Sequence, residues 1–206
     1  MKRAIGAVVL VLIVALGANA QMKFGAGAHA GLNFSSFPKP ADEVYGMGFG
    51  FGVHGDMEII KYVAVRFNFD YRMFSADQAK FGFYDVNTGQ PIPSSDISGG
   101  NISIIGIGFE GLGKLPLNGP VTPYGIFGLG LNISSASDVT ISYQGQEITR
   151  PAGDSSTNFG IDFGAGAEFK IAKAVSLYGE FKFLLIFTEG SSTSVFPLTV
   201  GATFWF

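Results

Sequence analysis

Apolar side chains stand at every second position of the C-terminal segment, and this period of two is the strongest constraint on the fold. The residues that share the pattern are Phe196, Leu198, Val200, Ala202, Phe204 and Phe206. Alternation of this kind predicts a β-strand with one apolar face. A segment that finishes on aromatic side chains would be poorly held at the end of a soluble domain. In a sheet that closes on itself within lipid, the apolar face would be covered.

The N-terminal segment has the pattern of an export signal. Met1-Lys2-Arg3 is basic, residues 4–17 are apolar, and Ala18-Asn19-Ala20 supplies the small residues that a signal peptidase recognises. We expect residues 1–20 to be cleaved, so that the mature domain spans residues 21–206 and begins with Gln21. A membrane anchor is the alternative, but the apolar run is shorter than the roughly 18 residues that a spanning helix needs.

Composition narrows the function classes. Removing Lys2 and Arg3 takes the net charge from −3 to −5, and an acidic chain argues against a nucleic-acid partner. The chain has no cysteine, which excludes disulfides and a lipid-modified N-terminal cysteine. Although 47% of residues are hydrophobic, no segment after Gly17 has the length of a spanning helix. If the chain resides in a membrane, it must therefore form a closed sheet.

Eight stretches alternate in this way, and the connections between them alternate in length. Short connections at 59–62, 113–122 and 172–174 and mostly longer, polar ones elsewhere are typical of outer-membrane barrels. We therefore predict an all-β fold, an eight-stranded antiparallel up-and-down transmembrane β-barrel with both termini on the periplasmic side. The predicted strands are 22–34, 45–58, 63–74, 101–112, 123–133, 157–171, 175–187 and 196–206, and the longer connections are 35–44, 75–100, 134–156 and 188–194.

The fourth stretch changes phase at Ile104-Ile105, which predicts a β-bulge there.

Alternation alone leaves two orientations of the barrel faces open, because an exported lipocalin-like barrel would point its aromatic side chains inward. An eight-stranded barrel has room for few large side chains, and the chain contains 21 Phe. We therefore expect the apolar face to meet lipid and the Gly-rich, charged face to line the lumen.

Charged residues recur on the predicted lumen face, and buried charges persist only when they are paired. We expect a cross-linked network with Arg66 near its centre, contacting Asp56, Glu58 or Glu110. The alternative is that these charges line a path for ions. The full predicted set is Lys23, Asp56, Glu58, Arg66, Asp70, Arg72, Glu110, Asp162, Glu168, Lys170, Glu180 and Lys182, with His29 and His54 nearby.

With these features the chain resembles the small bacterial outer-membrane β-barrels of the OmpA and OmpX type. The most specific part of the resemblance is the end of the chain, where Thr199, Gly201, Phe204 and Phe206 are similar to the family's assembly signal. The resemblance implies an outer-membrane location, contact with its lipid and recognition of these four residues by the barrel-assembly machinery. Phe204 and Phe206 would also fit an aromatic girdle.

Motifs that suggest chemistry are weak. Residues 106–111 match G-x-G-x-x-G, but the glycines alternate as in a strand and no helix follows. His29 and His54 are predicted to lie inside the barrel, away from the rim where a lipid-modifying enzyme would act. A metal site formed by His29, His54 and Asp56 is conceivable, but satisfied core histidines are the commoner case. We expect no enzyme activity, no cofactor and no metal.

The long loops are the best place for a function. Residues 75–100 surround a predicted turn at Asn87-Thr88-Gly89, and 134–156 contain a second predicted hairpin. Both hairpins would extend the barrel and offer strand edges to an extracellular partner, or they would pack on themselves. The predicted function is structural support and surface interaction around a plugged polar lumen. A narrow pore for ions or small solutes is the alternative, and a lipid- or peptide-modifying enzyme is third.

Overall fold

The computed structural model describes residues 22–39, 41–84, 89–115, 117, 119–143, 145–188 and 190–206. The predicted signal peptide and the start of the mature chain at Gln21 lie outside these residues, as do Asn87 and Thr88 of the predicted loop turn. No helix in the described part of the chain is long and apolar enough to cross a membrane.

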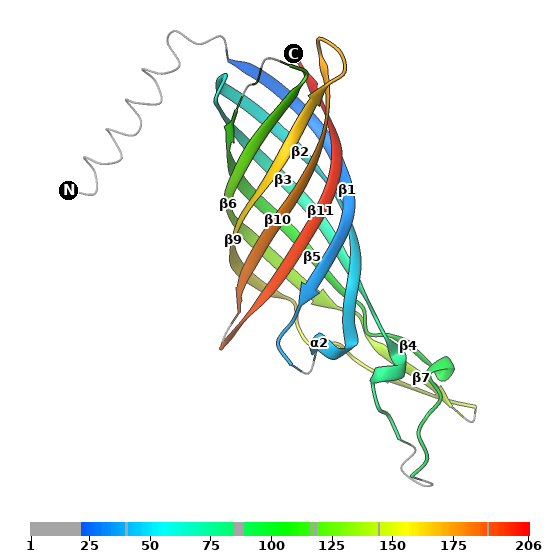
Figure 1. Cartoon of the computed structure of the whole chain (residues 1–206). Helices are drawn as coiled ribbons and strands as arrows, with labels where there is room; N and C mark the ends of the chain where they lie inside the picture. Colours follow the sequence, from blue (N-terminus) through cyan, green and yellow to red (C-terminus); the bar gives the residue numbers. More distant parts are fainter. Residues whose placement is uncertain are drawn as a thin grey trace, which may run out of the picture.

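Eight strands form a closed antiparallel barrel, which confirms the predicted fold (Figure 1). Each strand pairs with its neighbour along the chain, and the first and last close the barrel through pairs that run from Gly25 and Trp205 to Ser36 and Ser194. The barrel strands are β1 (Lys23–Ser36), β2 (Tyr45–Ile60), β3 (Val63–Ala76), β5 (Ile102–Lys114), β6 (Val121–Ala136), β9 (Ser156–Lys170), β10 (Val175–Thr188) and β11 (Ser191–Trp205).

The two ends of the barrel differ. At the turn end, where the C-terminus lies in Figure 1, strands are joined by the short segments 61–62, 115–120 and 171–174. At the loop end, the long connections contain short elements, and three strands among them form a separate sheet that projects from the barrel. These elements are α2 (Ala41–Val44), η1 (Gln78–Lys80), η2 (Ser94–Asp96), β4 (Ile97–Gly99), β7 (Val139–Tyr143) and β8 (Gln146–Arg150).

One predicted loop is absent from the described residues. The sequence predicted a connection at 188–194, but Thr188 pairs with Ser191 and both strands continue to a tight turn. Gly190 has a φ of 75°, a conformation that glycine adopts at little cost. Polar residues in 191–194 therefore extend β11 beyond its apolar face instead of forming a loop.

The predicted β-bulge at Ile104-Ile105 is wrong. Strand β5 pairs residue by residue with β3 and β6 through this point, and Ile104 points inward with 1% of its surface exposed. The apparent phase change has another cause: the lumen is apolar at the loop end. There Ile104 belongs to a buried cluster with Phe74, Leu184, Ile186 and Val195.

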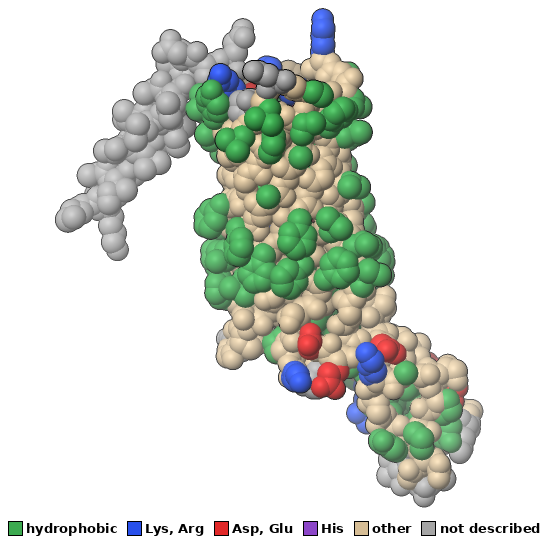
Figure 2. Space-filling view, in the orientation of Figure 1, with side chains coloured by type: hydrophobic (Ala, Val, Ile, Leu, Met, Phe, Trp, Pro, Cys, Tyr) green, Lys and Arg blue, Asp and Glu red, His purple; other side chains and the backbone are tan. Residues whose placement is uncertain are grey.

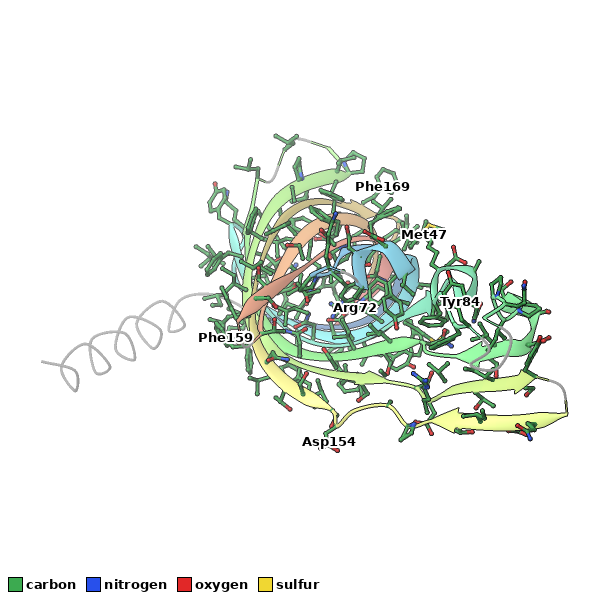
Figure 3. The ribbon with its side chains drawn as sticks, turned by 90° about the horizontal axis from the view of Figure 1, so that it is seen from below. Met47, Arg72, Tyr84, Asp154, Phe159 and Phe169 are labelled. Carbon is green, nitrogen blue, oxygen red and sulfur yellow. The ribbon has the colours of Figure 1, made fainter. Side chains whose placement is uncertain are left out.

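The outer wall is apolar, and the charged side chains in the middle of the barrel point inward, which confirms the predicted orientation of the two faces. Outward side chains such as Phe51, Phe109 and Phe127 are more than half exposed, whereas Arg66 is 5% exposed. Hydrophobic side chains gather in two bands on the visible wall, and charged ones lie at the ends (Figure 2). Seen along the barrel, Arg72 lies inside the ring of strands and Phe159 and Phe169 lie outside it (Figure 3).

Glycine on the inner wall makes room for neighbouring strands and their charged side chains. A Cβ atom added to Gly164 on β9 would lie 2.9 Å from both Cα and Cγ of Lys182 on β10. Outward glycines are different: a Cβ added to Gly125 on β6 would meet no atom within 4 Å. Gly164 is thus required by the narrow barrel, whereas Gly125 is free to change.

We expect Gly164→Ala to lower the free energy of unfolding by about 1–3 kcal/mol, because the extra methyl group overpacks the interior against backbone. Gly125→Ala is the matched control and should leave this free energy unchanged or raise it by up to about 1 kcal/mol. Denaturant unfolding of the barrel in lipid vesicles measures both. Equal effects of the two substitutions would contradict the packing argument.

Candidate functional site: the barrel lumen

Arg66 on β3 is the centre of the polar lumen. Its Nε and Nη2 atoms donate to the two carboxylate oxygens of Asp56 on β2, at 2.8 and 3.2 Å. Its Nη1 atom donates to Glu180 on β10 at 2.5 Å, and Glu110 on β5 lies 3.8 Å away. These contacts join four strands through one guanidinium group, whose planar donors suit two carboxylates at once.

Aromatic rings from β6, β10 and β2 lie around Arg66 and Glu180. The Tyr124 hydroxyl donates to Glu180 at 2.7 Å, and the guanidinium group of Arg66 lies 5.0 Å from the ring centroid of Tyr178. The Tyr178 hydroxyl lies 3.3 Å from Nδ1 of His54, whose Nε2 lies 3.1 Å from the Thr203 hydroxyl. Both ring nitrogens of His54 therefore lie within hydrogen-bonding distance of a hydroxyl group inside the barrel.

A second set of contacts lies toward the loop end. Lys182 donates to Glu110 at 2.7 Å, and Arg72 lies 3.2 Å from Asp70. Asn68 donates to both Glu110 and Asp70, at 3.1 and 2.9 Å, and so links the two ion pairs. His29 Nε2 lies 2.8 Å from Asp70.

A third set lies toward the turn end and contains a residue that sequence reasoning missed. Lys114 contacts Glu58 at 3.0 Å and Glu168 at 3.2 Å. Ser176 donates to Glu168 at 2.5 Å and accepts from the Trp205 indole at 3.1 Å. Because the fourth predicted strand stopped at residue 112, Lys114 was assigned to a loop. The alternation of Glu110, Leu112 and Lys114 could have placed it inside.

Of the three candidate partners of Arg66, Asp56 forms the close pair, and Glu58 pairs with Lys114. Three other predicted lumen residues differ from the expectation. Lys23 and Lys170 are exposed at the turn end and form no ion pair within the described part of the chain. Asp162 points inward opposite Gly128 but likewise has no ion pair among the described residues.

The buried cations of the described lumen each contact a carboxylate, and this arrangement has an energetic reason. Removing a charge from water costs several kcal/mol per ion, and a nearby opposite charge offsets part of that cost. Paired charges on different strands also oppose the separation of those strands. The cations that meet this condition are Arg66, Arg72, Lys114 and Lys182.

Two small cavities lie along the described lumen between its ends. A cavity of about 10 Å³ lies near Arg66 and another of about 10 Å³ lies near Asp70, each no larger than a single water needs. At the loop end, Phe37, Tyr45 and Ile102 pack against the buried apolar cluster. At the turn end, a mouth cavity of about 310 Å³ is open.

The described residues contain no group of side chains arranged to hold a metal ion. The rings of His29 and His54 are stacked with centroids 5.9 Å apart, but each histidine has its own partners, Asp70 for one and Thr203 and Tyr178 for the other. Residues 106–111 lie within strand β5, so the glycine motif does not begin a helix.

The residues of the predicted assembly signal lie in β11 and just beyond it. Thr199 is buried, whereas Phe204 and Phe206 are 54% and 72% exposed on the outer wall. Gly201 lies against the Tyr178 hydroxyl, where an added Cβ would be only 2.5 Å from the oxygen. Gly201 and the two aromatic residues therefore each have a role in the fold, and recognition by the assembly machinery stays a prediction.

Solved structures of outer-membrane proteins share this fold. A major outer membrane protein from Thermus thermophilus is 19% identical with a TM-score of 0.63, covering 91% of this chain and 100% of that one. Ail, the attachment invasion locus protein of Yersinia pestis, is 15% identical with a TM-score of 0.51, covering 90% and 98%. Neisserial surface protein A is 16% identical with a TM-score of 0.50, covering 90% and 97%.

Sequence comparison identifies the family. No curated protein matches the chain. A family model described as the outer membrane protein beta-barrel domain matches residues 6–204, which is nearly the whole chain. Together with the closed barrel and its apolar wall, this match places the protein in the outer membrane. The chain belongs to the outer membrane protein beta-barrel domain family.

Proposed function

We propose that this protein is a non-enzymatic outer-membrane barrel with a non-conducting lumen, which acts through structural support and through contacts made by its extracellular extension. The observation that carries the proposal is the pairing of Arg66 with Asp56 and Glu180 across the centre of the lumen. An ion that crossed the barrel would have to displace these contacts.

A pore is the alternative function, and the two ends of the lumen give opposite evidence about it. We assign the turn end to the periplasm and the loop end to the cell exterior, and the open mouth at this periplasmic end favours a pore. The apolar cluster around Phe74 and Ile104 at the extracellular end opposes it, because an apolar constriction excludes hydrated ions. The small cavities near Arg66 and Asp70 also support a closed lumen.

In a planar lipid bilayer, we expect the refolded protein to give no stable conductance steps. A porin of known conductance, reconstituted in the same way, serves as the positive control. Reproducible single-channel steps from the folded protein would contradict the closed lumen and favour the pore.

The burial of the two histidines supports the absence of catalysis. His54 is 5% exposed, and His29 pairs with Asp70 inside the barrel. A substrate in the outer leaflet or at the cell surface would not reach either ring without opening the wall. We also propose that the assembly machinery recognises Thr199, Gly201, Phe204 and Phe206, which lie at the end of β11 and just beyond it and include two exposed aromatic side chains.

The extracellular extension supports a role in surface interaction. Its sheet has the order β4-β7-β8, so β8 is an edge strand, and all five of its residues are exposed. Ile97, Ile141 and Ile148 form one row across the sheet, and only Ile148, on β8, is largely exposed, at 54%. A partner strand added beside β8 would cover Ile148 and use the free backbone groups of that edge.

Tyr143 and Gln146 form the closing pair of the β7–β8 hairpin. In an antiparallel ladder, every second residue of a strand directs its backbone N–H and C=O groups to its partner strand, and the residues between them direct these groups to the other side. Counting from the closing pair, Glu147 and Thr149 direct their backbone groups to the outer edge of β8. We expect Thr149→Pro to abolish binding of a fluorescent peptide with the β7 sequence 139–143, because proline removes an outward N–H without breaking the hairpin. Fluorescence anisotropy measures this binding.

Asp154→Pro, in the exposed segment after β8, is the control and should leave peptide binding unchanged. Equal peptide binding by the wild type and Thr149→Pro, or none by either, would argue against β8 as the docking edge.

A further inference from the structure

Charge is distributed unequally between the two ends of the barrel. The periplasmic rim carries Lys23, Lys61, Lys170 and Lys173, all exposed, and none forms an ion pair within the described residues. The acidic residues at this end, Glu58 and Glu168, are both held by Lys114. The extracellular end has the opposite balance, with Asp42, Glu43, Asp77, Asp96, Asp138, Glu147 and Asp154 against Lys39, Lys80 and Arg150.

Three of the rim lysines line one cavity. The mouth cavity of about 310 Å³ is bordered by Lys23, Lys170 and Lys173, and its floor includes Ser176 and Trp205. Glu58 and Glu168 also line it, but both carboxylates contact Lys114, so the three rim lysines leave the lining with an excess of positive charge. Ser176 is 1% exposed and holds the indole of Trp205 in place. The cavity therefore combines positive charge at its rim with a fixed aromatic floor, and a negatively charged group complements it.

The rim lysines stand directly beside the lipid-facing wall. Lys23 lies between Met22 and Phe24 in the sequence, and these two side chains are 39% and 48% exposed. Lys170 lies between Phe169 and Ile171, which are 44% and 52% exposed. Within these strands the lysines face the mouth and their neighbours face outward, so a molecule at the rim can contact the lysines and extend an apolar chain over the strand ends onto the wall.

The same arrangement occurs at the turn between β2 and β3. Lys61 lies between Ile60 and Tyr62, which are 36% and 47% exposed, and its ammonium group is 4.7 Å from the Tyr62 ring centroid. Long lysine side chains next to an apolar wall place their charge at the level of lipid headgroups. Positive charge and apolar surface thus alternate around this rim.

We propose that the periplasmic mouth binds the headgroup of an anionic phospholipid of the inner leaflet, with its phosphate at Lys23, Lys170 and Lys173 and its acyl chains on the adjacent wall. A soluble anion would use the lysines alone, and nothing in its chemistry would require the flanking Phe24 and Phe169. An acidic peptide would likewise gain nothing from the apolar wall.

Trp205 is the single tryptophan of the chain and lines the cavity, so its fluorescence reports occupancy. The experiment titrates the folded protein in zwitterionic detergent micelles with dihexanoyl phosphatidylglycerol. We expect a saturable change in Trp205 emission. Dihexanoyl phosphatidylcholine carries no net negative charge and should bind at least about tenfold more weakly, since each lysine near a membrane surface contributes roughly fivefold. Glycerol 3-phosphate and hexaglutamate, titrated separately, should also each bind at least about tenfold more weakly, because they have no acyl chain to cover the apolar wall.

The triple variant Lys23→Gln, Lys170→Gln, Lys173→Gln should weaken phosphatidylglycerol binding by at least about tenfold. Lys170→Gln alone, the variant to use if the triple variant does not fold, should weaken it about fivefold. The matched control at the other end, Lys39→Gln with Lys80→Gln, should leave it unchanged.

Four results would overturn the proposal. They are equal binding of phosphatidylcholine, equal binding of glycerol 3-phosphate, equal binding of hexaglutamate, or unchanged binding of phosphatidylglycerol by the folded lysine variants. The second would identify a site for soluble anions and the third a site for acidic peptides.

Discussion

The rest of the structure depends on how the barrel compensates the charge of Arg66. A guanidinium group that is 5% exposed inside a ring of strands cannot rely on water. Its partners, Asp56 and Glu180, come from the neighbouring strand and from the far side of the wall. The same contacts that satisfy the charge therefore hold opposite sides of the barrel together, which the ladders between adjacent strands cannot do.

A narrow barrel makes this compensation a problem of space. The charged side chains are long, and they fit because glycine stands beside them on the neighbouring strand, as at Gly164 next to Lys182. The apolar cluster around Ile104 covers the network at the loop end, and the mouth at the turn end stays open. This difference between the two ends of the barrel separates the two proposed functions: the loop end offers a strand edge, and the turn end offers positive charge next to the apolar wall.

The sequence predicted the fold well where one rule acts alone. Outward residues such as Phe109 alternate regularly because lipid accepts only apolar side chains, and Arg66 was predicted at the centre because a lumen charge needs partners. At the ends of the lumen, inward positions carry apolar as well as charged side chains, and there the predictions failed. Ile104 suggested a bulge because the apolar cap was not foreseen, and Lys114 was missed because the predicted strand stopped at residue 112, although the alternation continues to Lys114. The pairing of Arg66 with Glu180 depends on barrel closure across 114 residues of sequence separation, which no local pattern reports.

A double-mutant cycle between Arg66 and Glu180 tests the central claim that paired lumen charges hold the barrel closed. The free energy of unfolding in lipid vesicles is measured for the wild type, Arg66→Leu, Glu180→Gln and the double variant. Breaking a buried pair costs about 3–5 kcal/mol, so each single substitution should be strongly destabilising. The double variant should lose at least about 1.5 kcal/mol less than the sum of the two single losses, because one substitution removes the partner of the other. Losses that add within about 0.5 kcal/mol would show that the pair does not stabilise the barrel, and they would contradict the account.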